Sequence, residues 1–508
     1  MQQNDPLLRT GNLTKRFGEV IANNGISLEI QPGEIHCLLG ENGAGKTTLA
    51  ECLYGYFNPE EGDIYFNEEQ VRIASPSDAI RLGIGMVHQH FILVRPLSVI
   101  ENIVVGTDAA QIFLNLTQAA EKVEQLCLRY DVAINLSAKI WQLSVGEQQW
   151  VEILKALFGG VKLLILDEPT AVLTPQEAEK LFVILRKMRQ EGLSILFITH
   201  KLREVMEVSD RVTVLRRGEK VATVNTAEVS RADLAKMMVG REVVFRVDKP
   251  AVEIGEPVLE TIQLRGENER KQEVLRGVSL QVKAGEIVGV AGVSGNGQKE
   301  LFEAIVGVRK AQSGQILLAG RNITNLSAQT IASLGMAHIP EDRLVEGLVP
   351  EFSVAENLIL GLHKNGFFNY GGAMLDSQEV SSFADTCIED FEIATPSSKH
   401  PASNLSGGNL QKVIIARELS GRPKCLVANQ PTRGLDVGAI EYVHGRLLKQ
   451  REQATGILMF SEDLDEILTL ADRILVIFKG AIVGELDPDS TSREEIGLLM
   501  AGSLEDEP

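Results

Sequence analysis

Short apolar runs alternate with amphipathic stretches along most of this chain. Runs such as 34–39, 163–166 and 195–198 have the length of a buried strand. Stretches such as 176–190 instead repeat apolar residues at the spacing of a helix. The alternation of the two patterns predicts an α/β core with a buried sheet.

The whole pattern occurs twice. Residues 32–35 align with 284–287 at an offset of 252, and 143–146 align with 405–408 at an offset of 262. We expect the ten extra residues of the second copy near 363–372, a segment with glycine and phenylalanine that is typical of a longer loop. A period of this length indicates a duplicated domain, because solenoid repeats are about 20 to 50 residues long.

A short linker is expected between the copies. It contains Pro250, Gly255 and Pro257 among mixed charges, a composition typical of an exposed connection. We therefore predict a first domain at 6–245, a linker at 246–257 and a second domain at 258–503.

Composition limits the possible classes of protein. The chain has 508 residues and is 44% hydrophobic, which is typical of globular domains with large cores. It contains no run of about 18 apolar residues and begins with a polar segment, so we expect neither a membrane span nor a signal peptide. A net charge of −19 disfavours binding to nucleic acid. Its five cysteines lack C-x-x-C spacing and predict no disulfide framework or zinc site.

Residues 40–47 fit the phosphate-loop pattern G-x-x-x-x-G-K-[ST] between a predicted strand and a predicted helix. The glycines let successive N–H groups face an anion, while Lys46 supplies positive charge and Thr47 a hydroxyl for Mg²⁺. The pattern predicts an ATP-binding loop, made of Gly40, Glu41, Asn42, Gly43, Ala44, Gly45, Lys46, Thr47 and Thr48.

The strand at 163–166 ends in two carboxylates, Asp167 and Glu168. In an α/β sheet this is the edge where ligands bind. Asp167 is expected to hold Mg²⁺ through water, and Glu168 to act as general base for the attacking water. The pair alone could simply end a strand at the surface, but its combination with a phosphate loop favours catalysis.

The second copy keeps the glycines of the loop but loses its reactive groups. Gln298 and Lys299 stand at the positions of Lys46 and Thr47. Asn429 and Gln430 replace the two carboxylates by amides that cannot accept a proton at neutral pH. Lys299 lies one position after that of the missing lysine and could partly replace it, so weak nucleotide binding is an alternative for this copy. The retained glycines are Gly292, Gly295 and Gly297.

Two further segments, 143–149 (the first signature) and 405–411 (the second signature), resemble the signature of ATP-binding-cassette (ABC) ATPases. Alone, either segment could be a helix cap. The resemblance covers nearly the whole chain and implies two tandem cassettes, each a RecA-like α/β core with a small antiparallel β part and a helical subdomain. In that family two cassettes dock head to tail, and each ATP lies between one phosphate loop and the other cassette's signature.

The resemblance assigns roles in a competent ATP site. Gln89 matches a magnesium ligand that senses the membrane partner, and His200 matches the switch histidine that donates to the γ-phosphate and joins Glu168 as a catalytic residue. Phe17 matches the aromatic that stacks on adenine, although core packing explains it too. The other cassette would contribute Ser406, Gly407, Gly408 and Asp436.

The other site would be degenerate. Glu341 stands where Gln89 would be and Glu462 where His200 would be, so negative charge faces the phosphates. Ser144 and Gly146 of the first signature would face this site, together with Thr174, where the family usually has Asp.

Within the family, the chain resembles the fused ATPase subunit of bacterial importers for monosaccharides and nucleosides. Segments 86–91, 169–177, 339–343 and 429–436 resemble the nucleoside type, and the ribose and galactose type is the alternative. This implies two membrane permeases, an extracytoplasmic binding protein, a place on the cytoplasmic face of the bacterial membrane, and no direct substrate contact. The Ser-Val-x-Glu-Asn elements at 98–102 and 353–357 would form the permease groove, or simply cap helices.

Two other functional classes are alternatives. Soluble tandem cassettes that act on ribosomes or nucleic acid usually have two intact sites and a long charged linker, and this sequence has neither. A purely regulatory nucleotide switch would lack the turnover of an ATPase.

Overall fold

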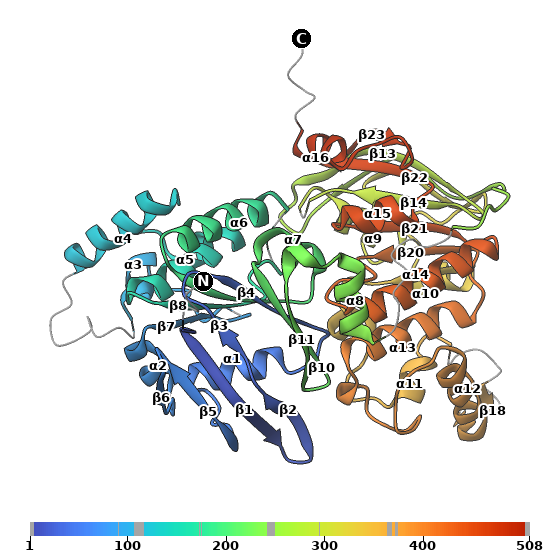
Figure 1. Ribbon diagram of the computed structural model, residues 1–508. Coiled ribbons are helices and arrows are strands. Elements are labelled where there is room, and N and C mark those ends of the chain that lie inside the picture. Colours follow the sequence, from blue (N-terminus) through green and yellow to red (C-terminus); the bar gives the residue numbers. More distant parts are fainter. Residues whose placement is uncertain are drawn as a thin grey trace, which may run out of the picture. The chain divides into compact units, whose positions relative to one another are not determined.

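The computed structural model divides into two compact units, Met1–Val243 and Val244–Pro508. It describes residues 5–89, 91–105, 116–171, 173, 175–240, 249–293, 295–362, 368–370 and 374–502. Each unit contains a six-stranded mixed sheet, a separate antiparallel sheet and a set of helices (Figure 1). The predicted α/β architecture with a small antiparallel part is therefore confirmed.

The six-stranded sheet of the first unit has the order β11-β10-β4-β9-β8-β7. All neighbours are parallel except β10 and β11. Strands β4, β7, β8 and β9 are buried along their whole length, as expected for parallel strands covered on both faces. The strands are β4 (Ile35–Gly40), β7 (Ile84–Val87), β8 (Leu163–Asp167), β9 (Ser194–Thr199), β10 (Arg211–Arg216) and β11 (Glu219–Asn225).

The antiparallel sheet of the first unit pairs β1 with β2, β3 and β5, and β5 with β6. Its strands are β1 (Leu8–Phe17), β2 (Val20–Ile26), β3 (Glu29–Ile30), β5 (Glu61–Phe66) and β6 (Glu69–Val71).

Helices α3, α4 and α5 pack on one another and form a helical group of the first unit (Figure 1). The helices of this unit are α1 (Lys46–Tyr54), α2 (Pro76–Leu82), α3 (Val99–Val104), α4 (Leu116–Tyr130), α5 (Val145–Phe158), α6 (Pro175–Gln190), α7 (Leu202–Val208) and α8 (Arg231–Val239), with 3₁₀ turns at Ile140–Gln142 and Thr226–Glu228.

The six-stranded sheet of the second unit has the order β17-β20-β21-β14-β22-β23, which repeats the first unit's order strand for strand. The duplication in the sequence is thus a duplication of topology. The strands are β14 (Ile287–Ala291), β17 (Met336–Ile339), β20 (Cys425–Asn429), β21 (Gly456–Ser461), β22 (Arg473–Phe478) and β23 (Ala481–Leu486).

The remaining strands and helices of the second unit also follow the first. Its antiparallel sheet contains β12 (Pro257–Glu267), β13 (Glu273–Lys283), β15 (Ser313–Leu318) and β16 (Arg321–Asn322). Its helices are α9 (Gln298–Ile305), α10 (Ala328–Ser333), α11 (Val354–Leu358), α12 (Ser377–Asp390), α13 (Gly407–Ser420), α14 (Val437–Glu452), α15 (Leu464–Leu470) and α16 (Arg493–Ala501), with a π-helical turn at Arg343–Gly347 and a 3₁₀ turn at Ala402–Asn404.

The longer loop expected at 363–372 contains a short strand. Within it, β18 (Asn369–Tyr370) pairs with β19 (Met374–Leu375), and 363–367 and 371–372 lie outside the described residues. In the expected linker, residues 249–255 form neither helix nor strand, and 246–248 lie outside the described part of the chain.

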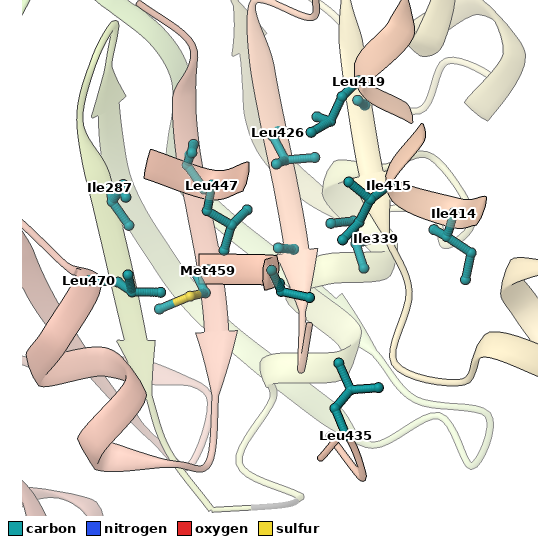
Figure 2. Close-up of a cluster of buried hydrophobic side chains, with 14 of the residues drawn as sticks. Ile287, Ile339, Ile414, Ile415, Leu419, Leu426, Leu435, Leu447, Met459 and Leu470 are labelled. Carbon is teal, nitrogen blue, oxygen red and sulfur yellow. The ribbon is translucent and has the colours of Figure 1, made fainter. Parts of the chain in front are cut away.

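A buried apolar cluster fixes the second unit's sheet against its helices. Figure 2 shows Leu426 and Met459 of the sheet facing Ile415 of α13 and Leu447 of α14. These side chains are almost entirely shielded from water. Their packing fixes the register of the strands, and therefore the positions of the loops that follow the strands' carboxyl ends.

None of the helices in the described residues is long and apolar enough to cross a membrane.

Candidate functional site

The phosphate loop of the first unit connects β4 to α1. Gly43 and Gly45 have φ of 81° and 94°, the left-handed region in which side chains are strained. A Cβ at Gly45 would lie 2.3 Å from the carbonyl oxygen of Ala22. The loop is therefore wound as the sequence pattern predicts, with α1 beginning at Lys46.

Lys46 is buried within this loop, with 5% of its surface exposed. Its Nζ donates to the carbonyl oxygens of Gly40 at 2.8 Å and Glu41 at 3.0 Å. The ammonium group is thus held by the loop itself, at the place where a phosphate needs a cation.

One residue of this loop's support was not predicted. Asn23, on β2, is fully buried, and its Nδ2 donates to the carbonyl of Gly45 at 3.0 Å. The sequence hints at this role of Asn23 only through the tandem alignment, in which the second copy has the apolar Leu275 at the position of Asn23.

Asp167 ends β8 and is 1% exposed. Burial raises its pKa to about 6, helped by the charge of Glu168, and the hydrogen bond from Thr47 and the charge of Lys46 only partly offset this. Its Oδ1 has no hydrogen-bond partner. A buried, unpartnered carboxylate oxygen beside a threonine hydroxyl fits a Mg²⁺ site, because hard cations prefer such oxygen ligands.

Glu168 follows with a left-handed φ of 47°. The Nδ1 of His200 lies 2.7 Å from its Oε1, and the Nε2 of Gln89 donates to its Oε2 at 3.2 Å. Burial alone would raise the pKa of Glu168, but the hydrogen bond and charge of His200, with Lys46, outweigh it and lower the pKa. The carboxylate is therefore ionised at neutral pH. The structure thus brings together Glu168, Gln89 and His200, which the sequence analysis assigned to one ATP site with different roles.

Phe17 is 43% exposed at the end of β1. Its ring forms a T-shaped pair with that of Phe57, with ring centroids 5.0 Å apart, and the Nζ of Lys15 lies 5.3 Å from the Phe17 centroid. An exposed aromatic face of this kind can stack on a purine ring.

The equivalent loop of the second unit is wound in the same way, with φ of 87° at Gly295 and 101° at Gly297. Its chemistry differs. The Nε2 of Gln298 donates to the carbonyl of Val290 at 3.0 Å, so a neutral amide fills the place of the lysine. Lys299 is exposed and pairs with Glu303 along α9, with Nζ and Oε1 3.8 Å apart. Ser294 of this loop lies outside the described residues.

The strand end also keeps its geometry without its charges. Gln430 has a φ of 51°, close to that of Glu168, and its Oε1 accepts from the backbone N–H of Glu462 at 3.2 Å. Asn429 is 4% exposed. Glu341 forms an ion pair with Arg433. The second strand end thus offers no proton acceptor comparable to Glu168.

The first signature is covered by acidic side chains. Ser144 caps α5 in a capping box, accepting from Glu147 N–H while the Glu147 carboxylate accepts from Ser144 N–H. A Cβ at Gly146 would lie 2.3 Å from Oε1 of Glu177, so this carboxylate sits directly on the glycine. Negative charge here disfavours a phosphate. Thr174 lies outside the described residues.

The second signature is open. Ser406 precedes α13 without capping it, and its Oγ accepts from Asn409 Nδ2 at 3.0 Å, which leaves its hydroxyl hydrogen to donate elsewhere. A pocket of about 160 Å³ lies beside it. The lining includes Ser406, Gly408, Asn409, Lys412, Asp436 and Ala439. Ala439 stands where the first copy has Glu177, a difference that the tandem alignment alone could have revealed.

Comparison with known proteins identifies this architecture. The family model for ABC transporters matches residues 23–171 and 275–433. The chain belongs to the ABC transporter family. The resemblance of the sequence to ABC ATPases is thereby confirmed, and with it ATP binding through an ABC cassette.

Relatives match this ABC protein over nearly its full length. The glucose import ATP-binding protein TsgD13 of Haloferax volcanii is 48% identical, covering 98% of this chain and 96% of its own. The nucleoside import ATP-binding protein NupA of Lactococcus lactis is 46% identical, covering 98% and 99%. The guanosine import ATP-binding protein NupO of Bacillus subtilis is 46% identical, covering 98% and 97%. The chain is a tandem ABC-type ATPase of the sugar and nucleoside importer type.

A solved structure shares the tandem fold. The archaeal ribosome recycling factor aABCE1, in complex with the stalk protein aP1, has a TM-score of 0.65 and 19% identity, covering 97% of this chain and 92% of its own. At this identity the likeness shows the fold alone.

Proposed function

We propose that this importer ATPase hydrolyses ATP at a single competent site and drives the uptake of a nucleoside. The observation that carries the single site is the contrast between Glu168, ionised and bonded to His200, and Gln430, an amide in the same backbone conformation. The nucleoside assignment is supported by the motifs at 86–91 and 429–436 and by the 46% identical nucleoside importer. A monosaccharide is the alternative, which the 48% identical glucose importer supports.

In the proposed site the first unit binds ATP and activates the attacking water. The phosphate loop and Lys46 bind the phosphates, and Phe17 stacks on the adenine. Glu168 accepts a proton from the attacking water, and His200, which contacts Glu168, would donate to the γ-phosphate. Thr47, Gln89 and Asp167, the last through water, would hold Mg²⁺, which neutralises phosphate charge when bound.

The second unit would complete this site. Ser406 and Gly408 would offer a hydroxyl and helix N-terminal N–H groups to the γ-phosphate, and Asp436 would stand beside them. The open pocket at the second signature and the acidic cover over the first support this assignment. The site opposite, with Gln298, Glu341, Gln430 and Glu462, would then be structural or regulatory.

An importer ATPase works with membrane permeases. We propose two of them, with an extracytoplasmic binding protein behind them and this chain on the cytoplasmic face of the membrane. The proposed domains are 6–245 and 258–503, joined by 246–257. Hydrolysis and phosphate release would reopen the cassette pair, and the permeases would follow.

The test of the single site is a pair of reciprocal substitutions. Glu168→Gln should lower steady-state ATP hydrolysis by about 100-fold or more, because a positioned general base contributes about 10²- to 10⁴-fold. Adding Gln430→Glu to this variant should restore nothing, since Lys46, Gln89 and His200 have no counterpart in the second site. Turnover that survives Glu168→Gln would refute the assignment.

The solute is tested in the assembled importer. Binding protein loaded with a nucleoside should stimulate hydrolysis by permease-bound ATPase, and binding protein loaded with a monosaccharide should not. The reverse result would establish the monosaccharide alternative.

A further inference from the structure

The segment after β17 in the second unit, Glu341–Gly347, runs along the signature helix α13. Its π-helical turn contacts α13 directly. Arg343 reaches two loops at once: Nη1 donates to the carbonyl of Gly407 at 3.2 Å, and Nη2 donates to the carbonyl of Arg433. Gly407 belongs to the second signature, and Arg433 to the loop that leads into Asp436. One guanidinium therefore joins the two loops that line the open pocket.

Two more contacts hold this segment. Glu341 pairs with the Arg433 side chain, and Nη1 of Arg417, on α13, donates to the carbonyl of Gly347 at 2.8 Å. The segment is thus tied to the Arg433 loop at its start and to the signature helix at its end. The side chains of Glu341 and Arg433 are 32% and 52% exposed, so their ion pair alone stabilises little. The charge-assisted bonds of Arg343 to two backbone carbonyls carry more of the constraint.

Among the residues of the first unit that the structure describes, no such arrangement is found. Phe91 and Ala171 stand at the positions of Arg343 and Arg433. Gln89, at the position of Glu341, donates instead to the catalytic carboxylate. The cross-link belongs to the cassette with the open signature.

We propose that Arg343 is a positioning residue, which holds the second signature and the Arg433–Asp436 loop in the orientation that receives the γ-phosphate before nucleotide arrives. This rests on the proposed function, in which Ser406 and Gly408 act on ATP bound at Lys46. Glu341, which replaces a magnesium ligand, then serves by holding the Arg433 side chain.

The test uses the full-length chain and Arg343→Phe, which installs the first copy's residue. Without nucleotide, amide exchange in peptides covering 405–412 and 432–439 should become about tenfold faster. The kcat for ATP should fall about tenfold. The KM should change less than about twofold, because Lys46 and its loop in the other unit are untouched. Arg343→Lys, which keeps a charged donor, should restore part of the rate.

Two controls separate this role from general damage. Arg321→Ala, at an exposed arginine of β16, should change neither exchange nor turnover. Arg433→Ala keeps the backbone carbonyl that Arg343 binds and should produce a smaller effect of the same kind. It also provides a second variant should Arg343→Phe fail to fold.

Comparing Arg343→Phe with Ser406→Ala distinguishes a wrong positioning role from a wrong assignment of the catalytic site. Unchanged exchange and kcat in a folded Arg343→Phe would overturn the inference. If Ser406→Ala also leaves kcat unchanged, the second signature does not serve the catalytic site and the proposed function fails. If Ser406→Ala lowers kcat while Arg343→Phe does not, only the positioning role is wrong.

Discussion

At the end of β8, two neighbouring carboxylates have pKa values displaced in opposite directions. Asp167 is buried beside one hydroxyl donor, and its pKa rises to about 6. Glu168 is also buried, but its bond to His200 lowers its pKa. Burial thus leaves Asp167 with an unpartnered oxygen, whereas the contact with His200 keeps Glu168 in the ionised form that the proposed general base requires. Sequence alone assigned these roles by position, and the contacts supply the reason.

Asp167→Asn, which installs the second unit's residue, should stabilise the chain in the absence of Mg²⁺ and nucleotide. Because the folded pKa of Asp167 exceeds its ordinary 3.8, ionising it costs folding free energy. The cost is complete above pH 6, shrinks as the pH falls towards 3.8 and vanishes below. Thermal unfolding should therefore show a gain on the order of 2 to 3 kcal/mol above pH 6 that declines in acid.

The same variant should lose its Mg²⁺-dependent activity, a trade of stability against function. Asp489→Asn, at an exposed position, is the control and should shift the unfolding midpoint little at any pH. An Asp167→Asn variant less stable than the wild type above pH 6 would show that the carboxylate is held by favourable contacts.

At the scale of elements, the two signature helices begin differently. Helix α5 has a complete capping box at Ser144, whereas Ser406 at the start of α13 makes no capping bond to the helix backbone. A capping hydroxyl satisfies an otherwise unpaired N–H and stabilises the helix. In the first signature, serine is used for stability. In the second, the same residue is left available to a ligand.

Matched alanine variants separate the two uses. Ser144→Ala should lower the stability of the first unit by about 1 kcal/mol and leave ATP turnover nearly unchanged. Ser406→Ala should leave the unfolding midpoint nearly unchanged but lower kcat. Calorimetric unfolding and steady-state turnover on both variants make the comparison. Equal losses of stability in both would contradict the difference in capping.

At the scale of the whole molecule, the duplication, the α/β core and the phosphate loop could be predicted, because each depends on local spacing. The glycines at 43 and 45 and the strand before them are enough to recognise the loop in the sequence. Contacts between distant segments could not be predicted. Three such contacts depend on how separate elements pack: those of Asn23 with Gly45, Glu177 with Gly146, and Arg343 with Gly407.

One chain should bind one nucleotide tightly. Equilibrium dialysis of Glu168→Gln with Mg²⁺ and ATP should give one tightly bound ATP per chain, because this variant keeps Lys46, Thr47 and Asp167 but cannot turn over. Adding Lys46→Ala should abolish that binding, since the loop loses its cation. Adding Gln298→Ala should leave it unchanged, because a neutral amide fills the second loop. Two tight sites would show that Lys299 supplies the missing charge and that the second site is a working binding site.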